Sequence, residues 1–131
     1  MPGRRYLLDT HVVINIGVGG GLQAMPAKVR KILEDPGSEL LVSVVSEAEV
    51  AIKSRIGKLN LTKDEWTLIC TNACISSFPL RQQHTDRLFD LPLRHKDPFD
   101  RLIISTALSE DFAVISNDQE FRKYKGLKVI W

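Results

Sequence analysis

Four acidic residues stand at positions from which a chain of alternating strands and helices can bring carboxylates together. Asp9 and Asp118 follow short apolar runs, whereas Glu49 and Asp100 lie in segments of helical character. Gathering four negative side chains costs free energy unless a cation lies among them. Hard divalent ions such as Mg2+ and Mn2+ prefer carboxylate oxygens as ligands. We therefore interpret these four acids as candidate catalytic and metal-binding residues of a metal-dependent enzyme.

The composition is that of a soluble globular protein, and we expect a single domain over residues 1–131. Hydrophobic residues make up 44% and charged residues 26% of the 131-residue chain, which disfavours a disordered chain and allows a sizeable core. No apolar run approaches the roughly 18 residues of a membrane span. Residues 1–5 lead directly into a strand without an apolar signal region. We expect a cytoplasmic protein that does not contact the membrane.

The two cysteines, Cys70 and Cys74, lie four residues apart in a segment with helical character. They have no His or Cys partner at the spacing of a metal site. We interpret both as small apolar core residues and expect no cysteine chemistry.

Apolar runs alternate with helical segments along the whole chain. Strands are predicted at residues 5–8, 39–43, 75–80, 113–116 and 127–131, the third of them at an edge because it contains Pro79. Helices are predicted at residues 11–16, 26–34, 46–56, 63–74, 82–90, 98–110 and 119–124. Ser46 is the expected N-cap of the third helix, and Thr62 with Glu65 is expected to form a capping box at the fourth. This alternation predicts a parallel sheet with helices on both faces. In such folds the functional crevice lies beyond the carboxyl ends of the strands, where Asp9 and Asp118 are expected.

Several of the acids also have a purely structural interpretation. Asp9 and Asp118 each precede a predicted helix and can serve as its N-cap. Asp97, followed by Pro98, is a typical N-cap before a helix that begins with proline. Asp100 fits a cap less well, because it heads the apolar stripe of the following helix and is expected to face inward near the helix N-terminus, where the backbone dipole favours an anion.

Glu49 is the more informative of the two glutamates in its helix. At 100° per residue it falls within an apolar stripe formed by Val45, Ala48, Ile52 and Ile56. A carboxylate on a buried stripe must be protonated or be paired with a cation or a metal ion. Lys53, one turn further on, can supply a simple ion pair. Both interpretations remain open from the sequence.

Basic residues flank the acids and suggest a polyanionic substrate. The net charge is only +2, which alone is a weak indication of a nucleic-acid partner. Lys53 follows Glu49 in the chain, while Lys96 and Arg101 flank the segment that contains Asp97 and Asp100. We predict that these three residues contact RNA phosphates. A solvated surface of mixed charge is the alternative explanation.

Five short motifs resemble those of the PIN-domain nucleases, and most of all the VapC-type toxins of bacterial toxin–antitoxin modules. They occur in the family's order and spacing at Leu7–Val12, Ser46–Lys53, His95–Leu102, Ile115–Asp118 and Val129–Trp131. The resemblance implies a three-layer α/β/α domain with a mainly parallel sheet. It also implies an endoribonuclease that uses Mg2+ or Mn2+, forms a homodimer and is silenced by a cognate antitoxin protein.

Transferred onto this chain, the family's acids are Asp9, Glu49, Asp100 and Asp118. Thr10, Ser116, Asn117 and Asp97 are expected to support them. Three departures stand out: Ala48 replaces a frequent aromatic residue, Ser116 stands where threonine is commoner, and the stretch 17–21 is rich in glycine. These departures leave the acid set intact and concern the shape of the substrate groove.

Two other classes compete with this interpretation. Phosphoryl transfer through an Asp-x-Asp motif is excluded because His11 occupies the position of the second acid. A PIN-fold module that binds protein or RNA without turnover is the remaining alternative, and retention of all four acids argues against it.

Overall fold

The structure is a computed structural model that describes residues 4–131. Its five strands form one sheet in the order β3-β2-β1-β4-β5, and all four pairings are parallel. The strands are β1 (Arg5–Leu8), β2 (Glu39–Ser43), β3 (Ile75–Phe78), β4 (Ala113–Ile115) and β5 (Val129–Ile130). From β1 the chain adds β2 and then β3 on one side, and it later adds β4 and then β5 on the other side. The two directions separate between β1 and β4, which is where parallel sheets of this kind open a crevice.

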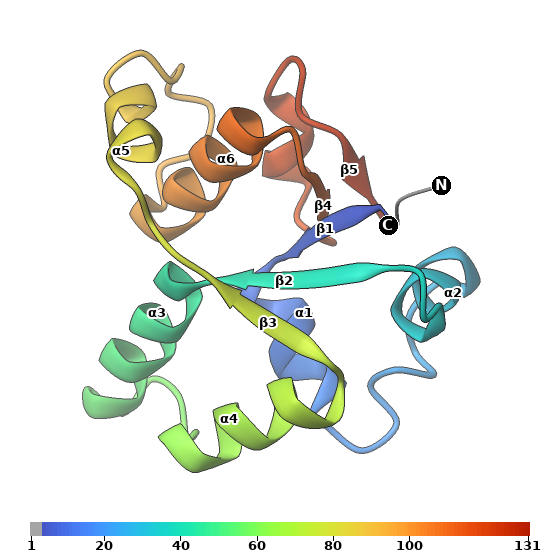
Figure 1. Ribbon diagram of the computed structural model, residues 1–131. Coiled ribbons are helices and arrows are strands. Elements are labelled where there is room, and N and C mark those ends of the chain that lie inside the picture. The colour runs from blue at the N-terminus through green and yellow to red at the C-terminus, as the bar shows by residue number, and fades with distance from the viewer. Residues whose placement is uncertain (1–3) are drawn as a thin grey trace.

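Six α-helices and one short 3-10 helix, η1, surround this sheet in the described residues. They are α1 (Thr10–Ile16), α2 (Ala27–Glu34), α3 (Val44–Arg55), α4 (Lys63–Asn72), α5 (Gln82–Leu88), α6 (Pro98–Glu110) and η1 (Gln119–Lys123). Figure 1 shows α5 and α6 on one side of the sheet and α1, α2 and α4 on the other. The expected three-layer α/β/α architecture is confirmed.

Two apolar cores result from the alternation of side chains along the strands. Leu7 of β1 belongs to the core that includes Ile103 and Ile104 of α6. Leu8, the next residue, belongs to the core formed with α1, α2 and α4. Both leucines are fully buried. Helices on both faces of the sheet therefore explain why β1 reads as a continuous apolar run rather than an alternating one.

The predicted element boundaries agree with the structure to within two residues, and α3 begins two residues earlier than predicted. Ser46 was expected to cap this helix, whereas Ser43, the last residue of β2, accepts the capping hydrogen bond from the Val45 amide. The capping box between Thr62 and Glu65 at the start of α4 is present as predicted. No helix among residues 4–131 has the length and apolar character needed to span a bilayer.

The interpretation of Cys74 as a core residue was also wrong. Cys74 is exposed and has a φ of 56° just after α4, whereas Cys70 is half-buried within that helix. The helix was predicted to continue to residue 74 but ends at Asn72, so Cys74 lies outside it.

The glycine-rich stretch after α1 is closely packed at two positions. A Cβ atom on Gly17 would lie 2.4 Å from the Ile69 Cδ1 of α4, and one on Gly21 would lie 1.8 Å from the Asn15 carbonyl oxygen. Both distances are far below van der Waals contact. Glycine at these positions therefore allows the turn to pack against α1 and α4.

Candidate active site

The four predicted acids converge at the carboxyl end of the sheet. Asp9 directly follows β1, and its carboxylate accepts a hydrogen bond from the hydroxyl of Ser116, which directly follows β4 (2.8 Å). The same hydroxyl oxygen accepts the Asp118 amide hydrogen (3.0 Å). Ser116 therefore links the first and the fourth acid through hydrogen bonds.

Asp9 is almost fully buried, with 3% of its surface exposed. It occupies the N-cap position of α1, but its side chain makes no capping hydrogen bond, so the structural explanation of this residue is wrong. Its Oδ2 atom accepts from Ser116, whereas its buried Oδ1 atom has no hydrogen-bond partner among the described residues. Burial raises the pKa of Asp9, and the nearby charges of Asp118 and Glu49 add to this rise. A buried carboxylate oxygen without a partner is costly and requires an explanation.

Glu49 lies on the buried side of α3, also with 3% exposure. Its Oε1 atom accepts a hydrogen bond from the Thr10 hydroxyl (2.9 Å), and its Oε2 atom pairs with the Lys53 ammonium at 2.5 Å. Thr10 also hydrogen-bonds Ser46 (2.8 Å). The hydrogen bond from Thr10 and the ion pair with Lys53 are thus both present, and the supporting role of Thr10 stays a prediction. The hydrogen bond from Lys53 to Glu49 raises the pKa of Lys53.

The apolar stripe that was used to place Glu49 was wrong, although Glu49 itself is buried. Ala48 is exposed, and Ile52 and Ile56 are 50% and 61% exposed. The buried side of α3 consists of Val45, Ser46, Glu49 and Val50. The inner side of α3 packs against α1 and α6. On this side Glu49 is close enough to Asp9 and Asp100 for its charge to raise the pKa of both.

Asp100 lies in the first turn of α6, and its pKa is raised to about 7. Burial is the main cause, and the negative charges of Asp9 and Asp97 come next. The carboxylate oxygen Oδ2 lies 2.8 Å from the Nε2 atom of His95. This environment disfavours a charged Asp100 unless a cation is added.

Asp118 and Asp97 both act as helix caps. Asp118 accepts the Glu120 amide hydrogen through Oδ1 (2.9 Å) at the start of η1, and its Oδ2 atom lies 3.2 Å from His95 Nε2. Asp97 accepts the Asp100 amide hydrogen (3.0 Å) at the start of α6. The Oδ1 atom of Asp118 therefore caps η1, and its Oδ2 atom lies in the candidate site beside His95.

His95 is the residue that the sequence analysis missed. Its Nε2 atom and carboxylate oxygens of Asp100 and Asp118 all lie within 4.8 Å of one another. The residue was part of the motif at 95–102, but no role was assigned to it. Its position two residues before the Asp97-Pro98 cap is the one signal that pointed to the site.

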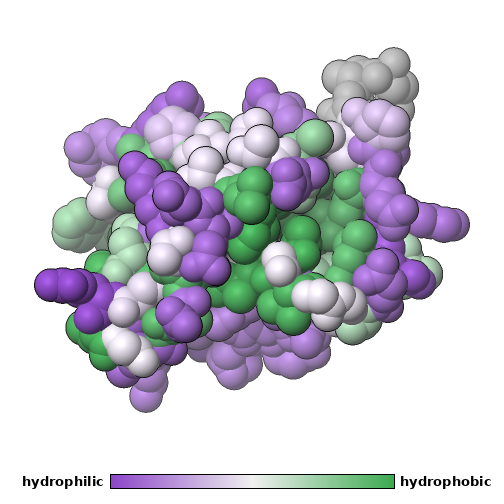
Figure 2. All heavy atoms as spheres, turned by 90° about the horizontal axis from the view of Figure 1, so that it is seen from below, coloured by the Kyte–Doolittle hydropathy of each residue, from purple (hydrophilic) through white to green (hydrophobic). Residues whose placement is uncertain are grey.

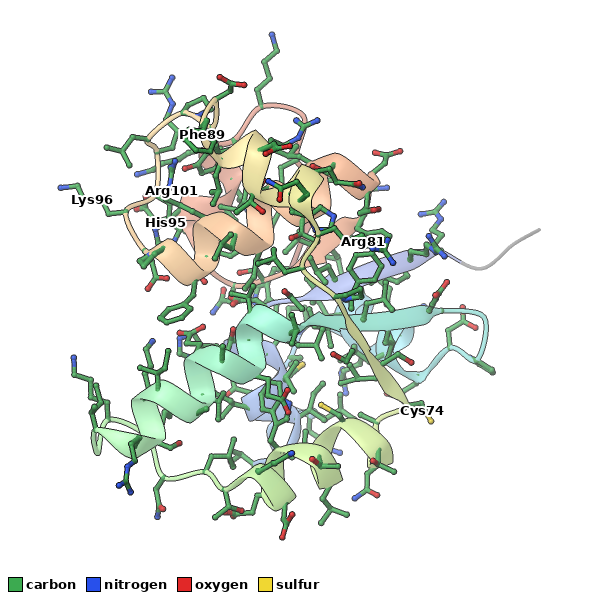
Figure 3. All side chains as sticks on the ribbon, turned by 60° about the vertical axis from the view of Figure 1, so that its left-hand side comes forward. Cys74, Arg81, Phe89, His95, Lys96 and Arg101 are labelled. Atoms are coloured by element: carbon green, nitrogen blue, oxygen red, sulfur yellow. The ribbon has the colours of Figure 1, made fainter. Side chains whose placement is uncertain are left out.

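The three predicted RNA contacts differ in their surroundings. Lys53 is paired with Glu49. The guanidinium of Arg101 donates to backbone carbonyls of the preceding loop and to the Tyr124 hydroxyl, so its contacts do not support the predicted role as an RNA ligand. Lys96 is exposed, and Figure 3 shows it pointing away from the molecule. Asn117, expected to support the acids, is exposed and makes no side-chain hydrogen bond within residues 4–131.

The donor set fits a hard divalent cation. The carboxylate oxygens of Asp9, Glu49, Asp100 and Asp118, the four acids predicted to bind the ion, are of the ligand type that Mg2+ and Mn2+ prefer. The partnerless Oδ1 atom of Asp9 is the observation that tests this fit, because a bound cation would give this buried oxygen the partner that the protein does not provide.

Solved structures with the same fold come from bacterial toxin–antitoxin complexes. VapBC2 from Rickettsia felis, bound to a promoter DNA fragment, matches with a TM-score of 0.69 and 14% identity over 96% of this chain and 97% of the other. VapBC-1 from nontypeable Haemophilus influenzae matches with a TM-score of 0.62 and 21% identity over 96% of both chains. A toxin–antitoxin complex from Klebsiella pneumoniae matches with a TM-score of 0.61 and 18% identity, also over 96% of both. No curated protein sequence matches the chain significantly.

Fold and site together define a parallel α/β domain with a cluster of acids at the carboxyl ends of β1 and β4. The model of the PIN domain family matches residues 6–127. The chain therefore belongs to the PIN domain family.

Proposed function

We propose that this protein is a metal-dependent endoribonuclease that hydrolyses RNA phosphodiester bonds and acts as the toxin of a toxin–antitoxin pair. The observation that carries the proposal is the buried Asp9 carboxylate, which has a partnerless oxygen and is surrounded by further acids. Membership of the PIN family and the likeness to VapBC complexes support it.

Asp9, Asp100 and Asp118 would hold the Mg2+ or Mn2+ ion, with Glu49 as a further ligand or as the base that orients water. A bound divalent ion lowers the pKa of a coordinated water and stabilises negative charge on the phosphate. The chain's own residues keep the acids in place: Ser116 holds Asp9, and Thr10 and Lys53 hold Glu49. Lys96 is the predicted RNA contact that is exposed and near the acids, and we retain it as a phosphate ligand.

The proposed activity is tested directly with purified protein and single-stranded RNA. We expect cleavage that requires Mn2+ or Mg2+, stops on addition of EDTA and returns when the metal is replenished. The alternative function, a PIN-fold binding module without turnover, would give RNA binding without cleavage under any metal condition. Gel analysis of end-labelled RNA separates these outcomes, because an endonuclease produces internal fragments.

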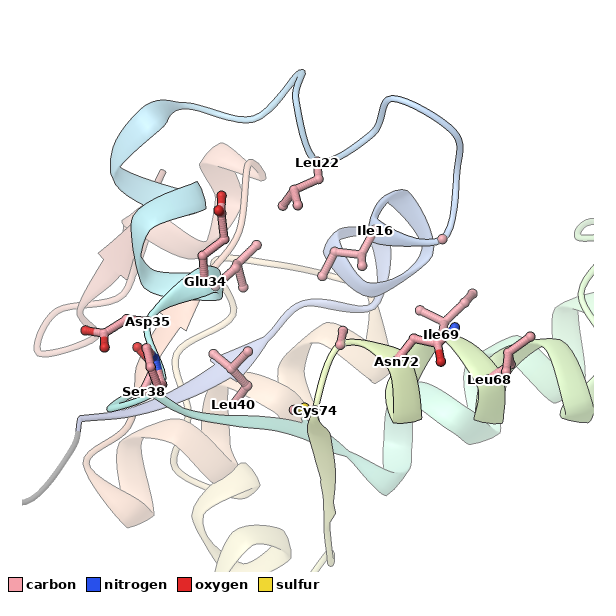
Figure 4. A pocket seen from close by; sticks show the side chains of 14 residues that line it. Ile16, Leu22, Glu34, Asp35, Ser38, Leu40, Leu68, Ile69, Asn72 and Cys74 are labelled. Carbon is pink, nitrogen blue, oxygen red and sulfur yellow. The ribbon is translucent and has the colours of Figure 1, made fainter.

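The antitoxin partner has a candidate docking site away from the acids. A groove of about 740 Å3 lies between α1, α2 and α4. Its apolar lining consists of Ile16, Leu22, Leu33, Leu40, Leu68 and Ile69, and the exposed acids Glu34 and Asp35 lie at one end (Figure 4). Figure 2 shows hydrophobic residues gathered at the centre of the face that α4 borders, with hydrophilic residues around them. This pattern fits an antitoxin segment with an apolar side and a basic residue.

Leu68 allows this docking site to be tested, because it lines the groove and is 59% exposed. We expect Leu68→Asp to weaken binding of the cognate antitoxin by about 10-fold or more, since it places a charge against an apolar segment. Leu93→Asp is the matched control, because Leu93 is 72% exposed and does not line the groove. Equal binding of both variants in a titration would contradict the docking site, and no binding by the wild type would contradict the antitoxin proposal.

Two further expectations stay predictions. The homodimer would be tested by sedimentation equilibrium, in which a purely monomeric protein would contradict it. The cytoplasmic location would be tested by cell fractionation.

A further inference from the structure

His95 bridges two of the acids, Asp100 and Asp118. Its Nε2 atom lies 2.8 Å from Asp100 Oδ2 and 3.2 Å from Asp118 Oδ2. The two acids belong to separate elements, since Asp100 lies in α6 and Asp118 precedes η1. The His95 side chain is only 13% exposed. A single, largely buried ring nitrogen therefore connects two carboxylates that would otherwise repel each other.

The hydrogen bonds of the ring identify His95 as a donor to Asp118, and the same nitrogen lies within ion-pair distance of Asp100. The Asp97 amide donates to Nδ1 (3.3 Å), which occupies the lone pair of that nitrogen. In a neutral imidazole the proton then lies on Nε2, the atom that faces Asp100 and Asp118. A protonated Nε2 has no free lone pair for a metal ion. This geometry places His95 beside the ligands and not among them.

The backbone of His95 is fastened as well as its ring. Its amide donates to the Tyr124 hydroxyl (2.9 Å), and its carbonyl accepts from Arg101 (3.4 Å). Arg101 also donates to the carbonyls of Leu91 and Pro92, so it holds the whole loop before α6 (Figure 3). Through these hydrogen bonds Arg101 fixes the conformation of the loop that carries His95.

We propose that His95 is a positioning residue that sets the separation and orientation of Asp100 and Asp118 for a divalent cation. The inference rests on the proposed function, because it assumes that these acids hold a metal ion. Hydrogen-bond partners of metal ligands commonly change metal affinity by about 10- to 100-fold when removed. Arg101 and Tyr124 support the acids indirectly, through the loop that carries His95.

Calorimetric titration of the purified protein with Mn2+ tests this role without an activity assay. His95→Ala should bind Mn2+ about 10- to 100-fold more weakly than the wild type. His95→Gln, which places an amide N–H near the position of Nε2, should recover most of this loss. Nitrogen NMR of the wild-type imidazole, without metal, should show an unprotonated Nδ1 and a protonated Nε2.

Leu93→Ala is the matched control in the same loop and should bind Mn2+ like the wild type, because Leu93 is exposed. If His95→Ala does not fold, as judged by circular dichroism, Tyr124→Phe should weaken Mn2+ binding in the same direction by loosening the loop. Unchanged or tighter binding by His95→Ala would overturn the inference, as would a Gln variant no better than Ala or a proton on Nδ1. Absence of Mn2+ binding by the wild type would instead refute the proposed function.

Discussion

Asp9→Asn is expected to abolish RNA cleavage while making the metal-free protein more stable. The substitution is nearly isosteric, and the asparagine amide oxygen can still accept the Ser116 hydrogen bond. It removes a buried charge that has a partnerless oxygen and lies near Asp118 and Glu49. Each kcal/mol gained should raise the Tm by roughly 3–5 °C for a domain of this size.

The loss of activity should be large because Asp9 has no other evident role: its side chain caps no helix and forms no ion pair in the part of the chain that the structure describes. Metal catalysis contributes several kcal/mol, and each 1.36 kcal/mol is about tenfold in rate. The expected decrease in the cleavage rate is therefore about 10³-fold or more. Thermal melts in EDTA and single-turnover cleavage in Mn2+ measure the two effects separately.

Asp111→Asn is the matched control for this variant. Asp111 is exposed at the C-terminal end of α6 with a φ of 58°, a conformation that asparagine tolerates well. The control should leave both the Tm and the cleavage rate unchanged. Wild-type cleavage by Asp9→Asn would rule out the proposed metal site, and a lower Tm without metal would contradict the view that Asp9 is electrostatically strained.

Much of the fold was predictable from local patterns because the chain carries strong start and stop signals. The capping box from Thr62 to Glu65 and the Asp97-Pro98 pair mark helix starts that the structure confirms. The start of α3 was not predictable in the same way, because β2 runs directly into the helix without a loop. The earlier serine, Ser43, caps it, and no turn residue separates the two elements to reveal this.

The site was predictable where parallel-sheet geometry determines a position, and not where packing between distant segments does. Asp9 and Ser116 follow neighbouring strands, so their proximity follows from strand order. The inward turn of Arg101 and the bridging position of His95 depend on Tyr124, which is more than 20 residues away in the chain. The apolar periodicity also gave a wrong stripe for Glu49, because the predicted apolar side of α3 is largely exposed and its buried side combines Val45 and Val50 with Ser46 and Glu49.

Mn2+ affinity is expected to fall steeply on acidification, because the metal must displace a proton from Asp100. The pKa of this carboxyl is raised to about 7 by burial and by the charges of Asp9 and Asp97. Below that pKa each pH unit should weaken binding about tenfold for one displaced proton. Calorimetry at several pH values measures this slope, and saturating Mn2+ should restore cleavage at the lower pH.

The stability of the metal-free protein should show the opposite dependence on pH. The folded pKa of Asp100, about 7, lies above the ordinary value of 3.8, so between these values the folded protein keeps a proton that the unfolded chain has released. The stabilisation is fully present below the ordinary pKa and is lost as pH rises through the folded one. Asp100→Asn should therefore raise the metal-free Tm at about pH 8, change it little near pH 4, and flatten the Mn2+ slope because binding itself is lost. A wild-type Mn2+ affinity that stays constant between about pH 5 and 7 would show that Mn2+ binding displaces no proton from the buried acids of this site.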